Sequence, residues 1–186
     1  MATTAATLEF IFEPPPNIER NTLLQGDLLA RTPALAEMIG EAHAYYATAE
    51  SYSHFLVLTQ SCDLVRRKGN CKSRYITICA VRPLSLAFER EMKKYIEPIK
   101  GFPLTVGNLA DQILARQFLE RVLNNTVDGI FFIPKGAGET VDEHLCAFLP
   151  LSIALRAEHY ATCLEAKVAQ ATGIFAAKIG SLTSGL

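Results

Sequence analysis

The hydrophobic residues of this chain fall into short continuous runs and longer stripes at helical spacing. The short runs have the length and branched composition of buried strands and predict strands at 25–30, 54–59, 74–82, 129–134 and 145–151. The stripes predict helices at 33–47, 83–97 and 108–125. A further strand is expected at 8–12, and it ends at Pro14–Pro16 because proline cannot donate to a strand ladder.

The last part of the chain carries apolar residues three or four positions apart: Leu164, Val168, Ala171, Phe175 and Ile179. This spacing predicts a C-terminal helical segment at 152–180, with an amphipathic helix that ends at Gly180. No internal repeat or linker is recognisable, so we expect one domain over 1–186 with its core at about 8–150.

The segment Lys68-Gly69-Asn70 lies between the two strongest predicted strands, 54–59 and 74–82. Its composition is typical of a hairpin or loop. We therefore expect these two strands to pair and to anchor the sheet.

Composition adds an expectation about partners. Apolar residues make up 49% of the chain and charged residues 20%, below the roughly 25% usual for globular domains. Such a surface predicts that an apolar face is covered by a larger protein subunit or by a second copy of the chain. The net charge of −1 gives no overall attraction to nucleic acid, so nucleic-acid binding would need a local patch.

The sequence also bears on compartment. No stretch reaches the roughly 18 apolar residues of a membrane span, and the first residues do not read as a signal peptide. The five cysteines are an odd number without close spacing, which favours reduced thiols. A cytoplasmic protein that does not enter membranes is therefore expected. The glycine-containing segments match no nucleotide fingerprint, and no cofactor is expected.

The most suggestive polar segment directly follows the strand at 54–59. Cys62 and Asp63 stand there, and with His54 they are the candidate catalytic residues, because a cysteine nucleophile needs a nearby base. None of the four histidines lies in a recognisable partner motif. A structural thiol, with Asp63 capping a turn, is the favoured alternative.

A zinc site at Cys62, Cys71 and Cys79 is a further hypothesis for this part of the chain. Cys62, Cys71 and Cys79 are separated by nine and eight residues, whereas paired zinc ligands usually stand two to four apart. Cys79 also falls in the middle of a predicted strand. No metal ligands are therefore predicted.

A run of cations occupies the expected loop: Arg66, Arg67, Lys68, Lys72 and Arg74. With Gln60 they are the candidate binding residues, for phosphates or for an acidic protein face. A solvated loop tip is the favoured alternative, because no aromatic residue for base stacking is interleaved before Tyr75.

Three segments together carry a resemblance: Gln25-Gly26-Asp27-Leu28-Leu29, His54 to Gln60, and Tyr75 to Pro83. Their order resembles the strand layout of the Kid/MazF/PemK toxin family. The resemblance implies an α+β fold built on an SH3-like antiparallel β-barrel, with inserted helices and the C-terminal amphipathic helix. The family's arginine-proline pair is replaced by Ser53-His54 at the opening of the central strand, so its catalytic set is not carried over. The whole chain is also similar to uncharacterised bacterial proteins found with mobile-element and phage-defence genes.

These observations lead to three hypotheses. The first is a non-catalytic protein-interaction subunit of a bacterial multi-protein system, such as one for phage defence, that docks through the last helix around Phe175. The second is a toxin-like endoribonuclease in which the loop at 66–74 holds RNA and Asp63, His54 or Cys62 transfers protons. The third is a thiol- or metal-centred sensor at Cys62 and Asp63. Whether the protein is an enzyme stays open.

Overall fold

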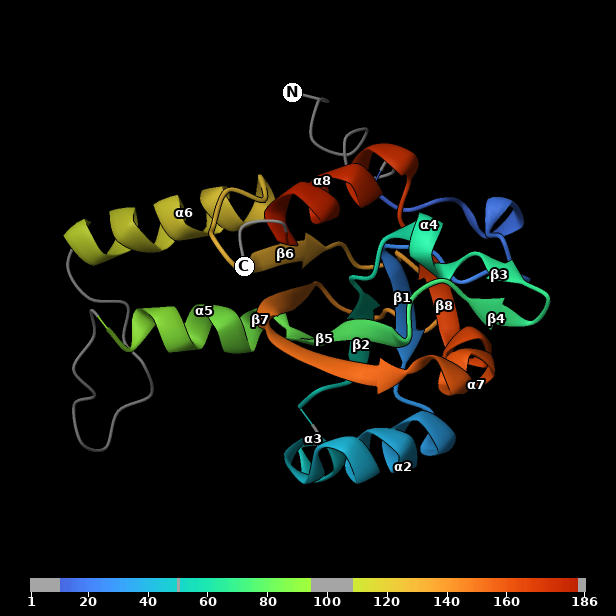
Figure 1. Ribbon diagram of the computed structural model, residues 1–186. Helices are drawn as coiled ribbons and strands as arrows, with labels where there is room; N and C mark the ends of the chain where they lie inside the picture. The colour runs from blue at the N-terminus through green and yellow to red at the C-terminus, as the bar shows by residue number, and fades with distance from the viewer. Residues whose placement is uncertain (1–10, 50, 95–108, 184–186) are drawn as a thin grey trace.

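The computed structural model describes residues 11–49, 51–94 and 109–183. They form one curled antiparallel sheet, an open half-barrel, with helices on both faces (Figure 1). The strands follow in the order β6 (Ile130–Ile133), β7 (Leu145–Arg156), β5 (Tyr75–Pro83), β2 (His54–Val57), β1 (Asp27–Ala30) and β8 (Lys167–Gln170). The mixed α and β class is confirmed in this form.

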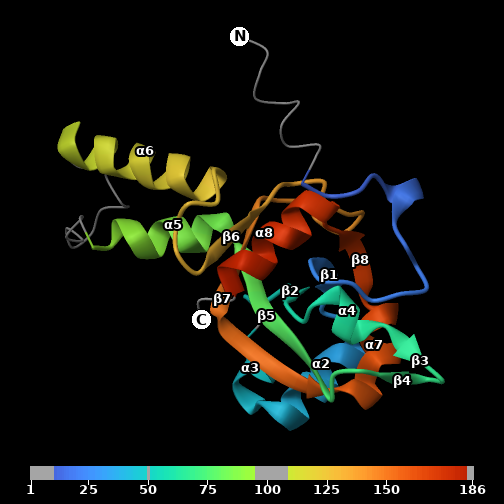
Figure 2. The ribbon, with the colours of Figure 1, turned by 45° about the horizontal axis from the view of Figure 1, so that its top comes forward.

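The helices fall into groups around the sheet. Their bounds are η1 (Pro15–Asn17), α2 (Pro33–Ala42), α3 (Ala44–Thr48), α4 (Ser61–Leu64), α5 (Leu84–Met92), α6 (Leu109–Leu123), η2 (Ala157–His159), α7 (Tyr160–Glu165) and α8 (Gly173–Thr183). Helices α2 and α3 lie on one side of the sheet and α8 on the other (Figure 1). Helices α5 and α6 run side by side away from the sheet (Figure 2), with the rings of Phe88 and Phe118 6.4 Å apart.

The central strands are buried on both faces, which explains their continuous apolar runs. Successive strand residues point to opposite faces. Leu28 accordingly packs into the core that contains Phe131 and Ile179, whereas Leu29 packs into the core that contains Leu35. The same division separates Leu56 from its neighbours Phe55 and Val57.

The predicted pairing of the two strongest strands is confirmed. β2 pairs antiparallel with β5, from His54 opposite Val81 to Val57 opposite Ile78. Between them the chain forms α4 and a separate ribbon of β3 (Arg66–Arg67) and β4 (Asn70–Cys71). Lys68 and Gly69, with φ of 52° and 88°, make the two-residue turn that a twisted hairpin prefers.

One of the three predicted helices is divided, and the other two are shorter than predicted. The predicted helix at 33–47 is divided at His43, which is extended at φ −158° and whose N–H closes the first helix on the carbonyl of Ile39. The helices predicted at 83–97 and 108–125 are confirmed over Leu84–Met92 and Leu109–Leu123. Residues 95–97 and 108 lie outside the described residues, as do residues 8–10 of the first predicted strand.

The prediction of a helical segment at 152–180 is wrong. The segment holds the end of β7, then η2, α7, β8 and α8, and α8 continues past Gly180 to Thr183. From Ser152 to Arg156 buried and exposed residues alternate, with Ile153 and Leu155 inside, so this stretch has the period of a strand. The apolar residues of this segment lie at helical spacing although they belong to different elements, because each of these elements turns apolar residues towards a core.

A buried ion pair joins β1 to β8. Nζ of Lys167 lies 2.8 Å from Oδ2 of Asp27, and both side chains are almost wholly inaccessible. The same carboxylate oxygen accepts the N–H of Leu24 at 2.6 Å. Burial raises the pKa of Asp27 to about 7, although the ammonium of Lys167 opposes this shift. Within the described residues, the second oxygen of Asp27 has no hydrogen-bond partner.

Candidate functional site

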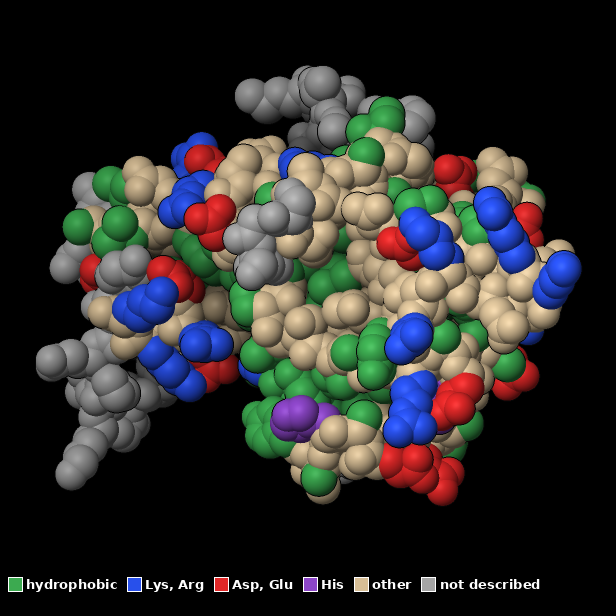
Figure 3. All heavy atoms as spheres, viewed as in Figure 1, with side chains coloured by type: hydrophobic (Ala, Val, Ile, Leu, Met, Phe, Trp, Pro, Cys, Tyr) green, Lys and Arg blue, Asp and Glu red, His purple; other side chains and the backbone are tan. Residues whose placement is uncertain are grey.

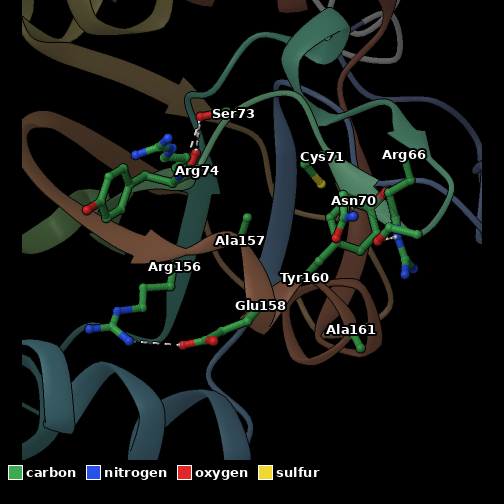
Figure 4. Close-up of a pocket in the computed structure, with 12 residues that line it drawn as sticks. Arg66, Asn70, Cys71, Ser73, Arg74, Arg156, Ala157, Glu158, Tyr160 and Ala161 are labelled. Carbon is green, nitrogen blue, oxygen red and sulfur yellow. Dashed lines mark hydrogen bonds and ion pairs between the residues drawn. The ribbon is translucent and has the colours of Figure 1, made fainter.

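The ribbon β3–β4, the start of β5 and the end of β7 enclose a hollow of about 530 Å³. We call it the arginine hollow, and its walls include Arg66, Asn70, Arg74, Tyr75, Arg156 and Tyr160. Figure 4 shows Arg74 and Arg156 on one side of it and Arg66, Asn70 and Tyr160 on the other, with Ala157 between.

Strand pairing brings the first side of this hollow together. Tyr75 is the register partner of Arg156 across β5 and β7, and the N–H of Ala157 donates to the carbonyl of Arg74 at 2.9 Å. The two arginines therefore project from neighbouring strand ends, although they are far apart in the sequence.

The opposite side is held by a cation–π contact. The guanidinium of Arg66 lies 5.0 Å from the centre of the Tyr160 ring, and its Nε donates to the carbonyl of Gly69 at 3.1 Å. The hydroxyl of Tyr160 accepts the N–H of Leu23 at 2.6 Å, which fixes the ring. Arg66 is thus oriented before any ligand arrives.

The charge of the hollow is positive. Glu158 forms an ion pair with Arg156 at 3.5 Å, but both side chains are well exposed and such pairs contribute little. No carboxylate within the described residues pairs with Arg66 or Arg74. On the side of the molecule that carries β3 and β4, Lys and Arg side chains lie with Asp and Glu side chains among them (Figure 3).

A second hollow, of about 640 Å³, adjoins the first. We call it the polar hollow, and its walls include Thr59, Gln60, Asp63, Ser73, Tyr75 and Pro150. Ser73 and Tyr75 line both hollows. Tyr75 is 54% exposed, so its ring stands at the boundary between the two.

A bulge in β7 supplies part of the polar hollow. The register shifts so that Cys79 faces Ser152 whereas Val81 faces Ala147, and the extra residues of β7 leave the ladder. Pro150 lies in this bulge, where a missing N–H costs no ladder bond, and it is exposed.

A buried glutamine holds the other wall in place. Nε2 of Gln25 donates to the carbonyl of Leu58 at 2.8 Å, and the N–H of Gln25 donates to Oγ of Ser61 at 3.0 Å. These bonds tie the exit of β2 to the entry of β1. Gln60 and Asp63 therefore sit on an anchored turn.

The predicted cationic run is divided by the ribbon. Arg66 lines the arginine hollow, whereas Arg67 and Lys72 line a separate depression together with Cys62. Lys68 is exposed in the turn. Nζ of Lys72 lies 2.7 Å from Oδ1 of Asp63. Because neighbouring strand residues point to opposite faces, the five cations do not form one patch.

The three candidate catalytic residues are not brought together. Cys62 is exposed beside Lys72, and Asp63 lines the polar hollow. His54 begins β2 and is buried, with Nδ1 2.9 Å from Oγ of Ser53 and Nε2 3.3 Å from Oγ1 of Thr140. The length of β2 separates it from the turn that follows the strand.

Burial determines the chemistry of three other cysteines. Cys79, Cys146 and Cys163 are buried, and burial raises the pKa of Cys146 and Cys163 to about 12. In the parts of the chain that the structure describes, no three His, Cys, Asp or Glu side chains are placed to hold a metal ion.

His54 makes folding sensitive to acid. Burial lowers the pKa of its imidazole below 6.5, so the folded protein disfavours the proton that the unfolded chain binds. The stabilising contribution of neutral His54 is present above pH 6.5 and is lost as the pH falls below it. We expect the fall in Tm between pH 7.5 and 5.5, followed by circular dichroism, to be smaller for His54→Gln. Equal falls in the two proteins would contradict this assignment.

Sequence reasoning missed two residues of the arginine hollow, Arg156 and Tyr160. Both fell in the segment that was predicted to be helical. The alternation from Ser152 to Arg156 was the available signal, since it marks a strand whose end brings Arg156 beside Tyr75.

Comparisons with protein-family models, with curated proteins and with solved structures found no match. Among the helices that the structure describes, none combines the length and the apolar character needed to cross a membrane. The shape and charge of the protein's own surface are therefore the basis for a functional proposal.

Proposed function

We propose that the protein binds single-stranded nucleic acid across the arginine hollow. The three arginines contact phosphates, and Tyr75 stacks on a base. The observation that supports this proposal is that the exposed Tyr75 lines the arginine hollow, which has three arginines on its walls. Single-strand binding sites combine a positive groove with aromatic rings on which bases stack.

The shape of the site favours a single strand over a duplex. In a duplex the faces of the bases are stacked on one another, and a side chain in a concave hollow does not reach them. In a single strand each base has a free face that Tyr75 can cover. The preformed contact between Arg66 and Tyr160 also lowers the entropy cost of ordering the arginine on binding.

The test of this proposal is the substitution Tyr75→Ala. Its binding to a fluorescein-labelled single-stranded RNA of about 12 nucleotides is measured by fluorescence anisotropy. Loss of one stacked base costs about 1–3 kcal/mol, which corresponds to weakening by about 5- to 150-fold. Tyr45→Ala is the matched control, because Tyr45 is similarly exposed, at 60%, but lies on α3 outside the hollow. Equal affinities of both variants and the wild type would refute the proposal.

The arginines are tested through the salt dependence of the same binding. Each phosphate contact in a single strand contributes about −0.7 to the slope of log K against log salt concentration. Arg74→Ala and Arg156→Ala should each make the slope shallower by about that amount. Arg90→Ala, an exposed arginine on α5, should leave it unchanged.

A toxin-like endoribonuclease of the Kid/MazF/PemK kind, built on an SH3-like barrel, is the second candidate. What supports it is the pair of Asp63 and Lys72, 2.7 Å apart beside a hollow suited to RNA. A carboxylate and an ammonium can exchange protons with a ribose hydroxyl and a leaving oxygen. Wild-type protein that leaves a panel of RNAs intact at molar excess would exclude this candidate.

The interaction-subunit function would need a different surface from the one first expected. Phe175 packs against the core, with its ring 6.2 Å from that of Phe131, so it does not present a free docking face. On the same helix Ile174 is 81% exposed. Substitution of Ile174 rather than Phe175 would therefore test docking through α8 without disturbing the core.

A further inference from the structure

The polar hollow differs in chemistry from the arginine hollow beside it. Its polar groups are hydroxyls, the amide of Gln60 and the carboxylate of Asp63, and no Lys or Arg is among the described residues that line it. The carboxylate of Asp63 is already paired with Lys72, so the lining of this hollow offers no free cation to a phosphate. The polar hollow is therefore suited to a neutral group with hydrogen-bond donors.

The carboxylate of Asp63 is positioned to accept such donors. Its Oδ1 binds Lys72 at 2.7 Å, and no donor within the described residues contacts Oδ2. Each carboxylate oxygen carries two lone pairs, so Oδ1 can accept a second donor while it holds Lys72. The carbonyl of Asp63 accepts the N–H of Ser73 at 3.0 Å, which fixes the backbone of Asp63 against the wall that carries Tyr75.

The walls suit the flat faces of a base. Tyr75 borders the hollow and Pro150 adds an exposed apolar surface. Ser73 holds the start of β5 in place, because its Oγ accepts the N–H of Tyr75 at 3.2 Å and donates to the carbonyl of the same residue at 2.7 Å. A base stacked near Tyr75 would present its edge to the polar groups of this hollow.

We infer that the polar hollow is a nucleobase subsite that prefers guanine, with Asp63 accepting from the base and Gln60 donating to it. This inference rests on the proposed binding of single strands. Guanine is the RNA base whose Watson–Crick edge offers two adjacent donors, the ring N–H and the amino group, next to a carbonyl oxygen. A carboxylate accepts the two donors and an amide N–H₂ reaches the oxygen. Adenine and cytosine would place a ring acceptor against the carboxylate, and uracil offers one donor.

The experiment compares four labelled single-stranded RNAs by fluorescence anisotropy: an all-uracil strand, and the same strand with one central guanine, adenine or cytosine. We expect the wild type to bind the guanine strand more tightly than the others by about 5- to 100-fold, the range for a good two-bond contact to a base edge. Asp63→Asn should abolish this preference, because the amide N–H₂ of asparagine is a donor and would face one of the two donors of guanine.

Two further variants make the result specific. Gln60→Ala, at an exposed position, should reduce the preference for guanine. Asp63→Asn also frees Lys72, whereas Gln60→Ala leaves the pair of Asp63 and Lys72 intact, so it excludes an indirect effect of the lysine. Glu158→Gln removes a carboxylate from the arginine hollow and should keep the preference. Equal binding of all four strands by the wild type would overturn the guanine inference while the proposed function stands. No binding of any strand would overturn both.

Discussion

Lys167→Met should remove a large part of the stability of this protein. The ammonium of Lys167 contacts four oxygens, namely Oδ2 of the buried Asp27 at 2.8 Å, the carbonyls of Glu19 at 2.7 Å and Thr22 at 3.0 Å, and Oε1 of Gln170 at 3.0 Å. Removal of one partner of a buried pair leaves an uncompensated charge and costs about 3–5 kcal/mol, against a usual total stability of about 5–15 kcal/mol. Urea denaturation followed by circular dichroism measures the loss. Lys135→Met, at an exposed lysine, is the control.

The loss should depend on pH in a defined direction. The folded pKa of Asp27 is raised to about 7 from an ordinary value of 3.8, and without the ammonium it rises further. A carboxyl with a raised folded pKa stabilises the fold below its unfolded pKa, and that contribution is lost as the pH rises through the folded pKa. Lys167→Met should therefore be closer to the wild type at pH 5 than at pH 8.

A second substitution separates the charge from the packing. Asp27→Asn in the Lys167→Met background removes the buried charge and keeps an acceptor for the N–H of Leu24. The double variant should recover about 1–3 kcal/mol relative to Lys167→Met alone. If the double variant is instead less stable than the single one, the buried charge is not the source of the loss.

Gly26→Ala should destabilise the fold although it adds only one methyl group. Gly26 has φ of +85°, and a Cβ there would lie 2.7 Å from Cβ of Ala171 and 3.3 Å from Cδ1 of Ile179. The left-handed backbone costs an alanine about 1–2 kcal/mol, and overpacking of a core adds about 1–3 kcal/mol. We expect a loss of about 2–5 kcal/mol in the free energy of unfolding, measured by urea denaturation.

Gly136→Ala isolates the contribution of the clash. Gly136 has a similar φ of +79°, but nothing lies within 4 Å of the position of its Cβ. Its substitution should therefore cost only the backbone strain of about 1–2 kcal/mol. Equal losses at the two glycines would mean that the contacts of Gly26 with Ala171 and Ile179 relax to admit a methyl group.

Two polar residues that follow β2, Gln60 and Asp63, line the same hollow. Asp63 and Gln60 enter the polar hollow from the turn, and Tyr75 joins that hollow to the arginine hollow. The proposed binding therefore uses part of the predicted set, namely Gln60, Asp63, Arg66 and Arg74. Neither Cys62 nor His54 is among the described residues that line the two hollows.

The sequence by itself determined the central strands and the turn of the ribbon. The runs at 54–59 and 74–82 are apolar on both faces because each strand is covered on both sides, and that is a local signal. Lys68 and Gly69 adopt the positive φ values of a two-residue hairpin turn, for which the glycine was a direct cue.

The tertiary structure alone decided what lies next to these strands. The register of β5 and β7 places Arg156 beside Tyr75, and the pairing of β1 with β8 buries Lys167 against Asp27. Such contacts join residues far apart in the chain, and local periodicity carries no information about them. In the last third of the chain the apolar residues of a strand and two helices fell by chance at helical spacing. For β8, only the pairing with β1, which supplies its hydrogen bonds, settles that ambiguity in favour of the sheet.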